Sequence, residues 1–384
     1  MDFRFTEQQE MFRDSVLAFA RKELADGALE RAHSAQFPHE VAKKMAEAGL
    51  LGITIPEKDG GSGGTLMDAV IAIETVATVC PRSADVIQEG NFGAIRVLAH
   101  FANDDQKKRY LAPILKGEEV IAVAMTEPEA GSATTDLVTS ATPDGAGYRI
   151  NGRKVFPNPH ADQYLVYVRY GPGVGGIGSV MLRRTAPGFS TGKPAKFMSG
   201  NDWATLYFDN VYVPPEDVLL GPGGFKKQIA GFNAERIGNA SRSLAYGRYC
   251  YTLAREYAMT RKQFGRPLCE FQGLQWQFAE LKMRLEAAQL LLYRAALSGG
   301  EAGIPTQMDT AIAKHTCNQV GFDACNFAMQ VMGGMGYSDE SLIEYMFRKT
   351  RGWMIAGGSL EILKQRVAEG VFGRSFDQRP PRAG

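Results

Sequence analysis

The hydrophobic pattern changes its period twice along the chain, and this constrains the fold more than any other feature. Near the start, residues such as Met11, Phe12, Val16 and Phe19 recur at helical spacing. Between about residues 118 and 221, short β-branched and aromatic runs alternate with Gly, Pro, Asn and Asp turns. Helical patterns return after residue 224. The sequence therefore predicts an α+β chain with its sheet in the middle.

We predict three domains: a helical N-terminal domain over residues 1–117, a compact β domain over 118–224 and a helical bundle over 225–384. Thr6 is the predicted start of the first helix, and residues 59–64 are a predicted loop between helices. The predicted strands include residues 148–150, 164–168, 179–182 and 205–208.

Composition excludes several classes of protein. The chain has 384 residues, with 43 Lys and Arg against 42 Asp and Glu, and no basic run that would suit nucleic acid as the main partner. No apolar stretch is long enough for a membrane span, and the first residues do not resemble a secretion signal, so we expect a cytoplasmic protein. The five cysteines show no CxxC pair, and neither disulfides nor a metal site are expected.

Three short motifs could carry chemistry, although each also has a purely structural interpretation. Residues 125–132 (MTEPEAGS) offer backbone and hydroxyl donors for a polar ligand, or form an ordinary turn. Residues 261–268 (RKQFGRPL) suit a pyrophosphate, or are a solvated helix end. Residues 330–336 (QVMGGMG) do not form a Rossmann fingerprint and could be a helix stop.

Together, and in this order, these motifs and the late segment 355–362 (IAGGSLEI) resemble the acyl-CoA dehydrogenase family over essentially the whole chain. The resemblance implies a helical N-terminal domain, a central β-barrel or sandwich domain and a C-terminal four-helix bundle. It also implies a homotetramer that binds FAD between the β domain and the bundle. Family members oxidise the Cα–Cβ bond of an acyl thioester and pass the electrons to an electron-transfer flavoprotein.

The resemblance implies several groups of cofactor-binding residues. Those along the isoalloxazine and ribityl chain are Met125, Thr126, Gly131 and Ser132, of which Ser132 also lies near the CoA. Those that reach the pyrophosphate and adenosine of a neighbouring subunit's FAD are Arg261, Gln263 and Phe264. Those that close on the ADP part are Gln330, Gly333 and Gly334, and those after the catalytic loop are Ser359 and Glu361.

The usual catalytic base is missing from its position. Most family members carry a Glu in the late loop where this chain has Gly357, whereas a minority, typified by isovaleryl-CoA dehydrogenase, carry it on the first long helix of the bundle beside an Arg. Glu235 and Arg236 match that second position. We therefore predict Glu235 as the base and Arg236 as a support for the CoA or the helix, against the alternative of a solvated helix pair. The N–H of Gly357 remains available for the thioester oxygen.

Two further regions depart from the family pattern. Phe156 can shield the flavin, but the amide of Asn158 replaces the hydroxyl expected near flavin N5, and Pro157 and Pro159 remove two backbone donors. The Asp that commonly follows AGS is Ala133.

The predicted substrate pocket is unusually polar. Asn239 and Arg242 follow Glu235 on one helix face, and Gln88 and Glu89 match the family's pocket floor. These residues favour a polar or carboxylated acyl group, unless Arg242 pairs with a structural carboxylate or an interface.

The leading prediction is an FAD-dependent acyl-CoA dehydrogenase, and three alternatives stay open. The same machinery could run in reverse, as in crotonobetainyl-CoA reductase, or act on an acyl-carrier-protein thioester. The chain could also be a flavin-binding member without dehydrogenase activity, like the DNA-binding alkylation-response members, although its neutral charge argues against DNA.

Overall fold

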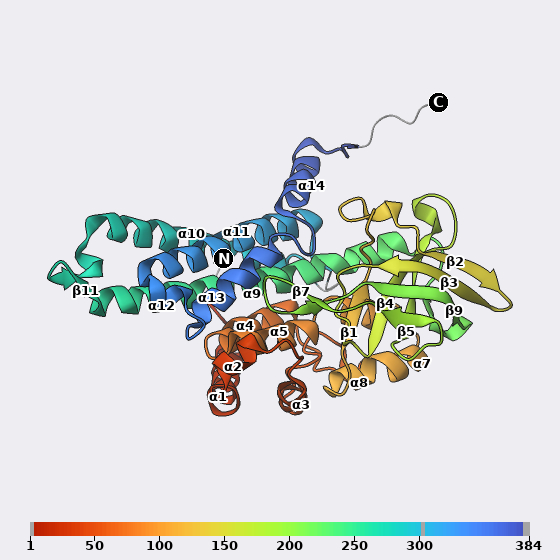
Figure 1. Cartoon of the computed structure of the whole chain (residues 1–384), viewed down its shortest axis with the longest axis horizontal. Helices are drawn as coiled ribbons and strands as arrows, with labels where there is room; N and C mark the ends of the chain where they lie inside the picture. The colour runs from red at the N-terminus through yellow and green to blue at the C-terminus, as the bar shows by residue number, and fades with distance from the viewer. Residues whose placement is uncertain (1–3, 301–303, 379–384) are drawn as a thin grey trace.

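The computed structural model describes residues 4–300 and 304–378. The sheet formed by the middle of the chain lies at one end of the long axis, and the C-terminal helices extend to the other end. The N-terminal helices lie below both in this view (Figure 1). The fold class predicted from the sequence is confirmed.

The N-terminal region is helical because its apolar residues repeat at helical spacing. Thr6 caps the first helix with a capping box to Gln9, as the sequence predicts. The helices that cover this region are α1 (Glu7–Glu23), α2 (Ala28–His33), α3 (His39–Glu47), α4 (Leu66–Ala77), α5 (Pro81–Glu89), α6 (Ala94–Phe101), α7 (Asp104–Gln106) and α8 (Ala112–Leu115). A π-helical turn over Lys107–Leu111 joins α7 to α8, which periodicity did not predict.

The middle region forms one mixed sheet in which β10, β5, β4, β2, β3, β9 and β6 follow in order, with β1 beside β4. Strand β4 is buried along almost its whole length, which explains its continuous apolar run. The strands are β1 (Ile121–Ala124), β2 (Ser140–Asp144), β3 (Gly147–Lys154), β4 (Gln163–Arg169), β5 (Ile177–Arg183), β6 (Phe189–Thr191), β9 (Leu206–Val213) and β10 (Val218–Leu220). A separate small pair consists of β7 (Ala195–Lys196) and β8 (Asp202–Trp203).

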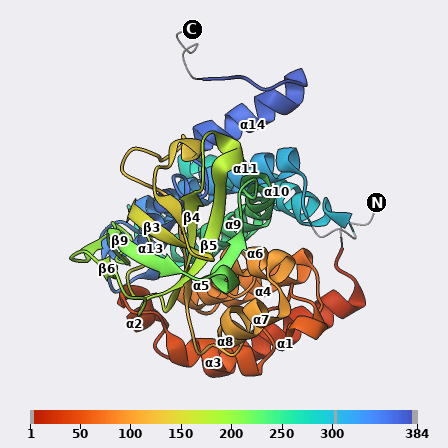
Figure 2. The ribbon, with the colours of Figure 1, turned by 90° about the vertical axis from the view of Figure 1, so that its right-hand side faces the viewer.

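The C-terminal helices pack around α11, which contacts α9, α10, α13 and α14. In two views at right angles, α14 projects away from the rest of the molecule (Figures 1 and 2). The elements are α9 (Phe225–Thr260), β11 (Lys262–Gln263), β12 (Arg266–Pro267), α10 (Gln272–Leu297), α11 (Gln307–Met332), α12 (Gly334–Tyr337), α13 (Leu342–Trp353) and α14 (Leu360–Phe372). None of the helices in the described ranges has the length and apolarity that a membrane crossing needs.

Candidate active site

Glu235 lies where α9 crosses α5, and two glycines make this crossing possible. Gln88 of α5 donates a hydrogen bond from Nε2 to Oε2 of Glu235 over 2.6 Å. A Cβ on Gly238 would lie 2.9 Å from Cγ of Gln88, and one on Gly93 would lie 2.9 Å from Oε2 of Glu235. Gly93 also has a φ of +68°, which favours glycine. Gly238 thus lets α9 approach α5 closely, and Gly93, the N-cap of α6, leaves room for the carboxyl of Glu235.

The surroundings of Glu235 raise its pKa to about 7. Burial is the main cause, and the nearby Glu89 adds to it, whereas Arg242, the hydrogen bond from Gln88 and Lys314 act in the opposite direction. A carboxyl with a pKa near neutrality can both accept and release a proton at physiological pH. This environment differs from that of a solvated helix pair, and the role of Glu235 as the base stays a prediction.

The loop that follows α13 contributes glycines instead of a carboxylate. Gly357 and Gly358 have φ values of +73° and +101°. Arg236 donates from Nε to the carbonyl of Gly357 over 3.2 Å, and Lys314 donates from Nζ to the carbonyl of Gly358 over 3.0 Å. The neighbour of Glu235 on α9 therefore holds this loop against α9.

Arg242 forms the pair with a structural carboxylate that was the alternative to a substrate contact. Its Nη1 lies 3.0 Å from Oδ1 of Asp85 on α5, and its guanidinium lies 4.5 Å from the ring centroid of Trp353. Asn239 accepts a hydrogen bond from Nδ2 of Asn318 over 2.8 Å. Both side chains are buried, and a contact of either one with substrate stays a prediction.

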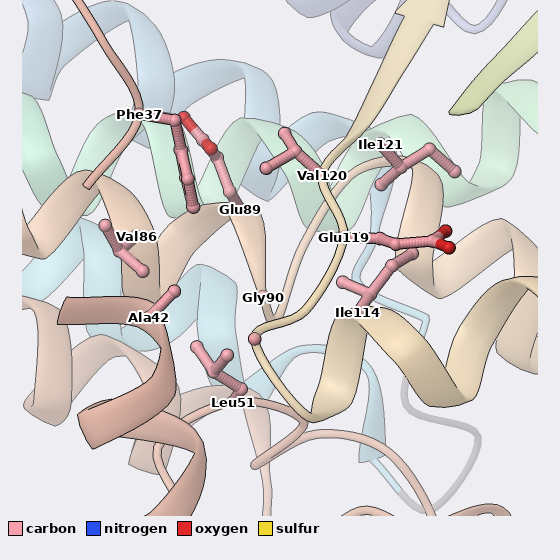
Figure 3. A pocket seen from close by; sticks show the side chains of 11 residues that line it. Phe37, Ala42, Leu51, Val86, Glu89, Gly90, Ile114, Glu119, Val120 and Ile121 are labelled. Carbon is pink, nitrogen blue, oxygen red and sulfur yellow. The ribbon is translucent and has the colours of Figure 1, made fainter. Parts of the chain in front are cut away.

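Glu89 comes from the end of α5 and lines a pocket between the N-terminal helices and the start of β1. Figure 3 shows its side chain beside that of Phe37, with Val120 and Ile121 on the β1 side. The side chain of Glu89 has protein atoms around it, yet part of its surface stays accessible because it faces the pocket. Burial raises its pKa, against the opposing effect of Arg82.

A buried ion pair fixes the segment that contains Met125, Thr126, Gly131 and Ser132. Lys154 of β3 lies 2.8 Å from Oε1 of Glu127 and also donates to the carbonyl of Met125 over 3.0 Å. The carboxylate of Glu127 accepts from the backbone N–H of Thr139 over 2.9 Å. Gly131 and Ser132 remain exposed. The sequence does not indicate this anchor, because nothing in it pairs Glu127 with a lysine 27 residues later.

Phe156 stands next to this segment in an unusual conformation. Its φ is +77°, which is rare and strained for an aromatic residue, and its side chain is 51% exposed. Its ring lies 4.9 Å from that of Trp203 and 6.0 Å from that of Phe197, neither of which sequence analysis identified. The only signal for Trp203 was a tryptophan within a turn-rich segment.

Asn158 is engaged with its own loop. Its Oδ1 accepts from the N–H of His160 over 2.9 Å, and its carbonyl accepts from the hydroxyl of Tyr164 over 3.1 Å. These bonds set the orientation of the amide and leave Nδ2 as its remaining donor.

The other predicted cofactor residues lie in two separate places. Arg261, Gln263 and Phe264 form a β11–β12 hairpin rather than a plain helix end, at the opposite end of the molecule from the central sheet (Figure 1). Gln330 lies in the last turn of α11, Gly333 caps that helix with a φ of +58°, and Gly334 begins α12. Ser359 caps α14, and Glu361 lies in its first turn. A single chain thus does not bring the hairpin to the segment at 125–132.

Comparison with known proteins identifies the family. The models of the acyl-CoA dehydrogenase N-terminal, middle and C-terminal domains match residues 6–118, 122–211 and 222–372. The 3-sulfinopropanoyl-CoA desulfinase of Paraburkholderia xenovorans is 32% identical over 98% of this chain and 99% of its own length. The acryloyl-CoA reductase (NADH) of Anaerotignum propionicum is 33% identical over 97% of both chains.

A solved structure agrees with these relatives. The butyryl-CoA dehydrogenase of Megasphaera elsdenii superposes with a TM-score of 0.88 at 31% identity, over 97% of this chain and 100% of the other. The chain therefore belongs to the acyl-CoA dehydrogenase family of FAD-dependent oxidoreductases, which act on CH–CH groups.

Proposed function

We propose that the protein oxidises the Cα–Cβ bond of an acyl-CoA, with Glu235 as the base. The observation that carries this proposal is a largely buried carboxyl with its pKa raised to about 7, on a helix whose next residue, Arg236, binds a glycine loop without a carboxylate of its own. Glu235 would take the proton from the α-carbon while the N–H of Gly357 stabilises the developing charge on the thioester oxygen. FAD, when bound, would supply the acceptor for the hydride that leaves the β-carbon, so that a C=C bond forms.

The segment at 125–132 and the neighbouring Phe156 have side chains that suit the flavin part of such a cofactor. The exposed ring of Phe156 offers an aromatic face, and Thr126 and Ser132 offer hydroxyl donors on a segment that the Glu127–Lys154 pair holds in place. Asn158 retains a free amide donor beside them. The reduced cofactor would then pass its electrons to an electron-transfer flavoprotein.

An oligomer would complete the cofactor site. Four exposed apolar side chains recur every seven residues along α10, with exposures of 66%, 66%, 48% and 63% for Trp276, Met283, Leu290 and Leu297. Such a stripe suits contact between copies of the chain. A neighbouring copy could then bring its hairpin, in which Phe264 is 94% exposed, to the segment at 125–132. These features support the homotetramer implied by the family.

A substitution on α10 tests this assembly. We expect Met283→Glu to lower the mass measured by light scattering and to reduce the flavin content of the purified protein, because the charge would have to be buried between copies. Met11→Glu, at an equally exposed methionine on α1, should change neither. A variant that kept the parental mass and flavin would contradict an interface on α10.

The acyl group is proposed to be polar or carboxylated. Glu89 faces the pocket lined by α5 and β1, and this polar group supports the proposal, whereas Arg242 is already paired with Asp85. A relative that acts on 3-sulfinopropanoyl-CoA supports the same class of substrate.

Anaerobic titration tests the proposed function. The yellow protein is mixed with straight, branched and carboxylated acyl-CoA thioesters, and bleaching of the flavin absorbance is followed. We expect bleaching with a subset of them, and a loss of about 100-fold or more in its rate in Glu235→Gln. Glu89→Gln should still show flavin bleaching, because this variant keeps Glu235 as the proton acceptor. Parental bleaching by Glu235→Gln would mean that another group is the base.

The reverse reaction is the second candidate, because one relative is an acryloyl-CoA reductase. It predicts that photoreduced protein is reoxidised faster by an enoyl-CoA than the oxidised protein is bleached by the saturated thioester. A carrier-protein thioester in place of CoA would be recognised in the same two assays.

A further inference from the structure

Lys314 of α11 is fully buried, and among residues 4–300 and 304–378 it forms no ion pair. Burying a lysine costs free energy unless its nitrogen finds partners. Here Nζ donates to the carbonyl of Trp353 and to that of Gly358, both over 3.0 Å. These two carbonyls lie at the two ends of the loop that carries Gly357.

The loop is held from two helices. Besides Lys314, Asn318 of α11 donates to the carbonyl of Trp353 over 2.7 Å, and Arg236 of α9 donates to that of Gly357 over 3.2 Å. A Cβ on Gly357 would lie only 3.5 Å from Cε of Lys314, so the lysine packs directly beneath this residue.

Lys314 and Glu235 also influence one another's ionisation. Burial lowers the pKa of Lys314 to about 7, with Arg236 and Arg242 acting in the same direction and Glu235 in the opposite one. Around Glu235, the groups from the packed elements are Gln88 and Glu89 of α5, Arg242 of α9 and Lys314 of α11. Of these four, Arg242 contacts the ring of Trp353, whereas Lys314 is the one that, in the described residues, donates hydrogen bonds to the backbone of the 353–358 loop.

We propose that Lys314 is a positioning residue, which ties the two ends of the 353–358 loop and supplies a charge that favours the ionised form of Glu235. This inference rests on the proposed function of Glu235. It joins two tasks in one side chain: the placement of the Gly357 N–H and the protonation state of the base. Loss of the lysine should therefore alter how the rate depends on pH, which loss of a loop contact alone should not do.

The test compares Lys314→Met with Asn318→Leu. The first removes a charge and two bonds to the loop, whereas the second removes an uncharged donor to the same carbonyl of Trp353. The rate of flavin bleaching in a single turnover is measured from pH 5.5 to pH 9, a range of about two units around the two pKa values. In parallel, infrared difference spectra of each protein against its Glu235→Gln counterpart follow the carboxyl band without turnover.

We expect the acidic limb of Lys314→Met to move to higher pH by roughly one unit, and the carboxyl band with it, because a nearby cation no longer favours the carboxylate. Lys314→Arg should restore the parental limb. Asn318→Leu should lower the rate at every pH without this shift. An unshifted limb in Lys314→Met, or an equal shift in Asn318→Leu, would overturn the proposal.

Two further arms keep the outcome decisive. If Lys314→Met does not fold, Lys314→Gln takes its place, because it keeps a donor for the carbonyls and loses only the charge; the same shift is expected. If Glu235→Gln bleaches like the parent, the proposed function itself fails. Inactive Glu235→Gln with unshifted Lys314 variants would refute only the role of Lys314.

Discussion

Two carboxylates on facing helices, the buried Asp85 on α5 and the partly buried Glu235 on α9, have opposite electrostatic surroundings. Burial alone would raise the pKa of Asp85, but Lys349, Arg242 and Arg82 outweigh it and hold that pKa well below its usual range. Within the described part of the chain, the carboxyl of Glu235 has one direct hydrogen bond, from the neutral amide of Gln88, and burial raises its pKa to about 7. The same chemical group thus has a lowered pKa beside three cations in one place and a raised pKa in the other, as the proposed base needs.

The difference lies in how many cations are close. Lys349, Arg242 and Arg82 approach the carboxylate of Asp85 to 2.8, 3.0 and 3.4 Å. A buried carboxylate with these partners stays ionised and is costly to remove. A carboxyl that must exchange a proton cannot be stabilised so strongly in one state, and Glu235 is not.

Replacing Asp85 with Asn should have the largest effect on stability. Three buried cations would lose their carboxylate, so we expect a loss of about 3–5 kcal/mol in the free energy of unfolding, measured with urea. Asp14→Asn, at an exposed pair with Arg13, should cost less than about 1 kcal/mol. A loss no greater than that of Asp14→Asn would show that Asp85 is not an anchor.

Replacing Glu235 with Gln should instead raise the free energy of unfolding. With a folded pKa of about 7 and an ordinary value of 4.5, this carboxyl favours the folded state fully at low pH, and that contribution is lost as the pH rises from about 4.5 to about 7. We therefore expect Glu235→Gln to become more stable than the parent by up to about 3 kcal/mol across this window. Urea unfolding of both proteins at several pH values measures the difference. A difference that did not grow with pH would refute the raised pKa.

A substitution at Gly93 should have a smaller effect on stability and should also slow the reaction. A Cβ would lie 2.9 Å from Oε2 of Glu235, and φ is +68°, so we expect Gly93→Ala to cost about 1–2 kcal/mol and to slow flavin bleaching. Gly273→Ala in α10, where the added Cβ meets nothing within 4 Å, serves as the control and should be neutral or slightly stabilising. Equal stability and equal bleaching rates in both variants would show that Gly93 does not position the carboxyl.

Much of this structure could be predicted from local sequence. The capping box at Thr6, the apolar run of β4 and the end of α11 before Gly333 each follow from residues close together in the chain. The sequence also indicates Glu235 as the candidate base, because the pair Glu235–Arg236 matches the position at which a minority of the family carries its base.

The long-range pairings could not be predicted in this way. Arg242 follows Asp85 by 157 residues, and only the packing of α9 on α5 brings the two together. Lys314 looks like an isolated charge within an apolar helix until the 353–358 loop folds against it. The hairpin at β11–β12 was interpreted as a helix end, because two-residue strands leave almost no pattern.

A crystal structure of the FAD-loaded protein with a non-oxidisable acyl-CoA analogue would test the central claim most directly. The claim predicts that an oxygen of Glu235 lies about 3–3.5 Å from the α-carbon of the acyl chain, with the thioester oxygen at the N–H of Gly357. A complex in which the Glu235 carboxyl faces away from that carbon, and another acidic or basic group stands over it, would contradict the claim.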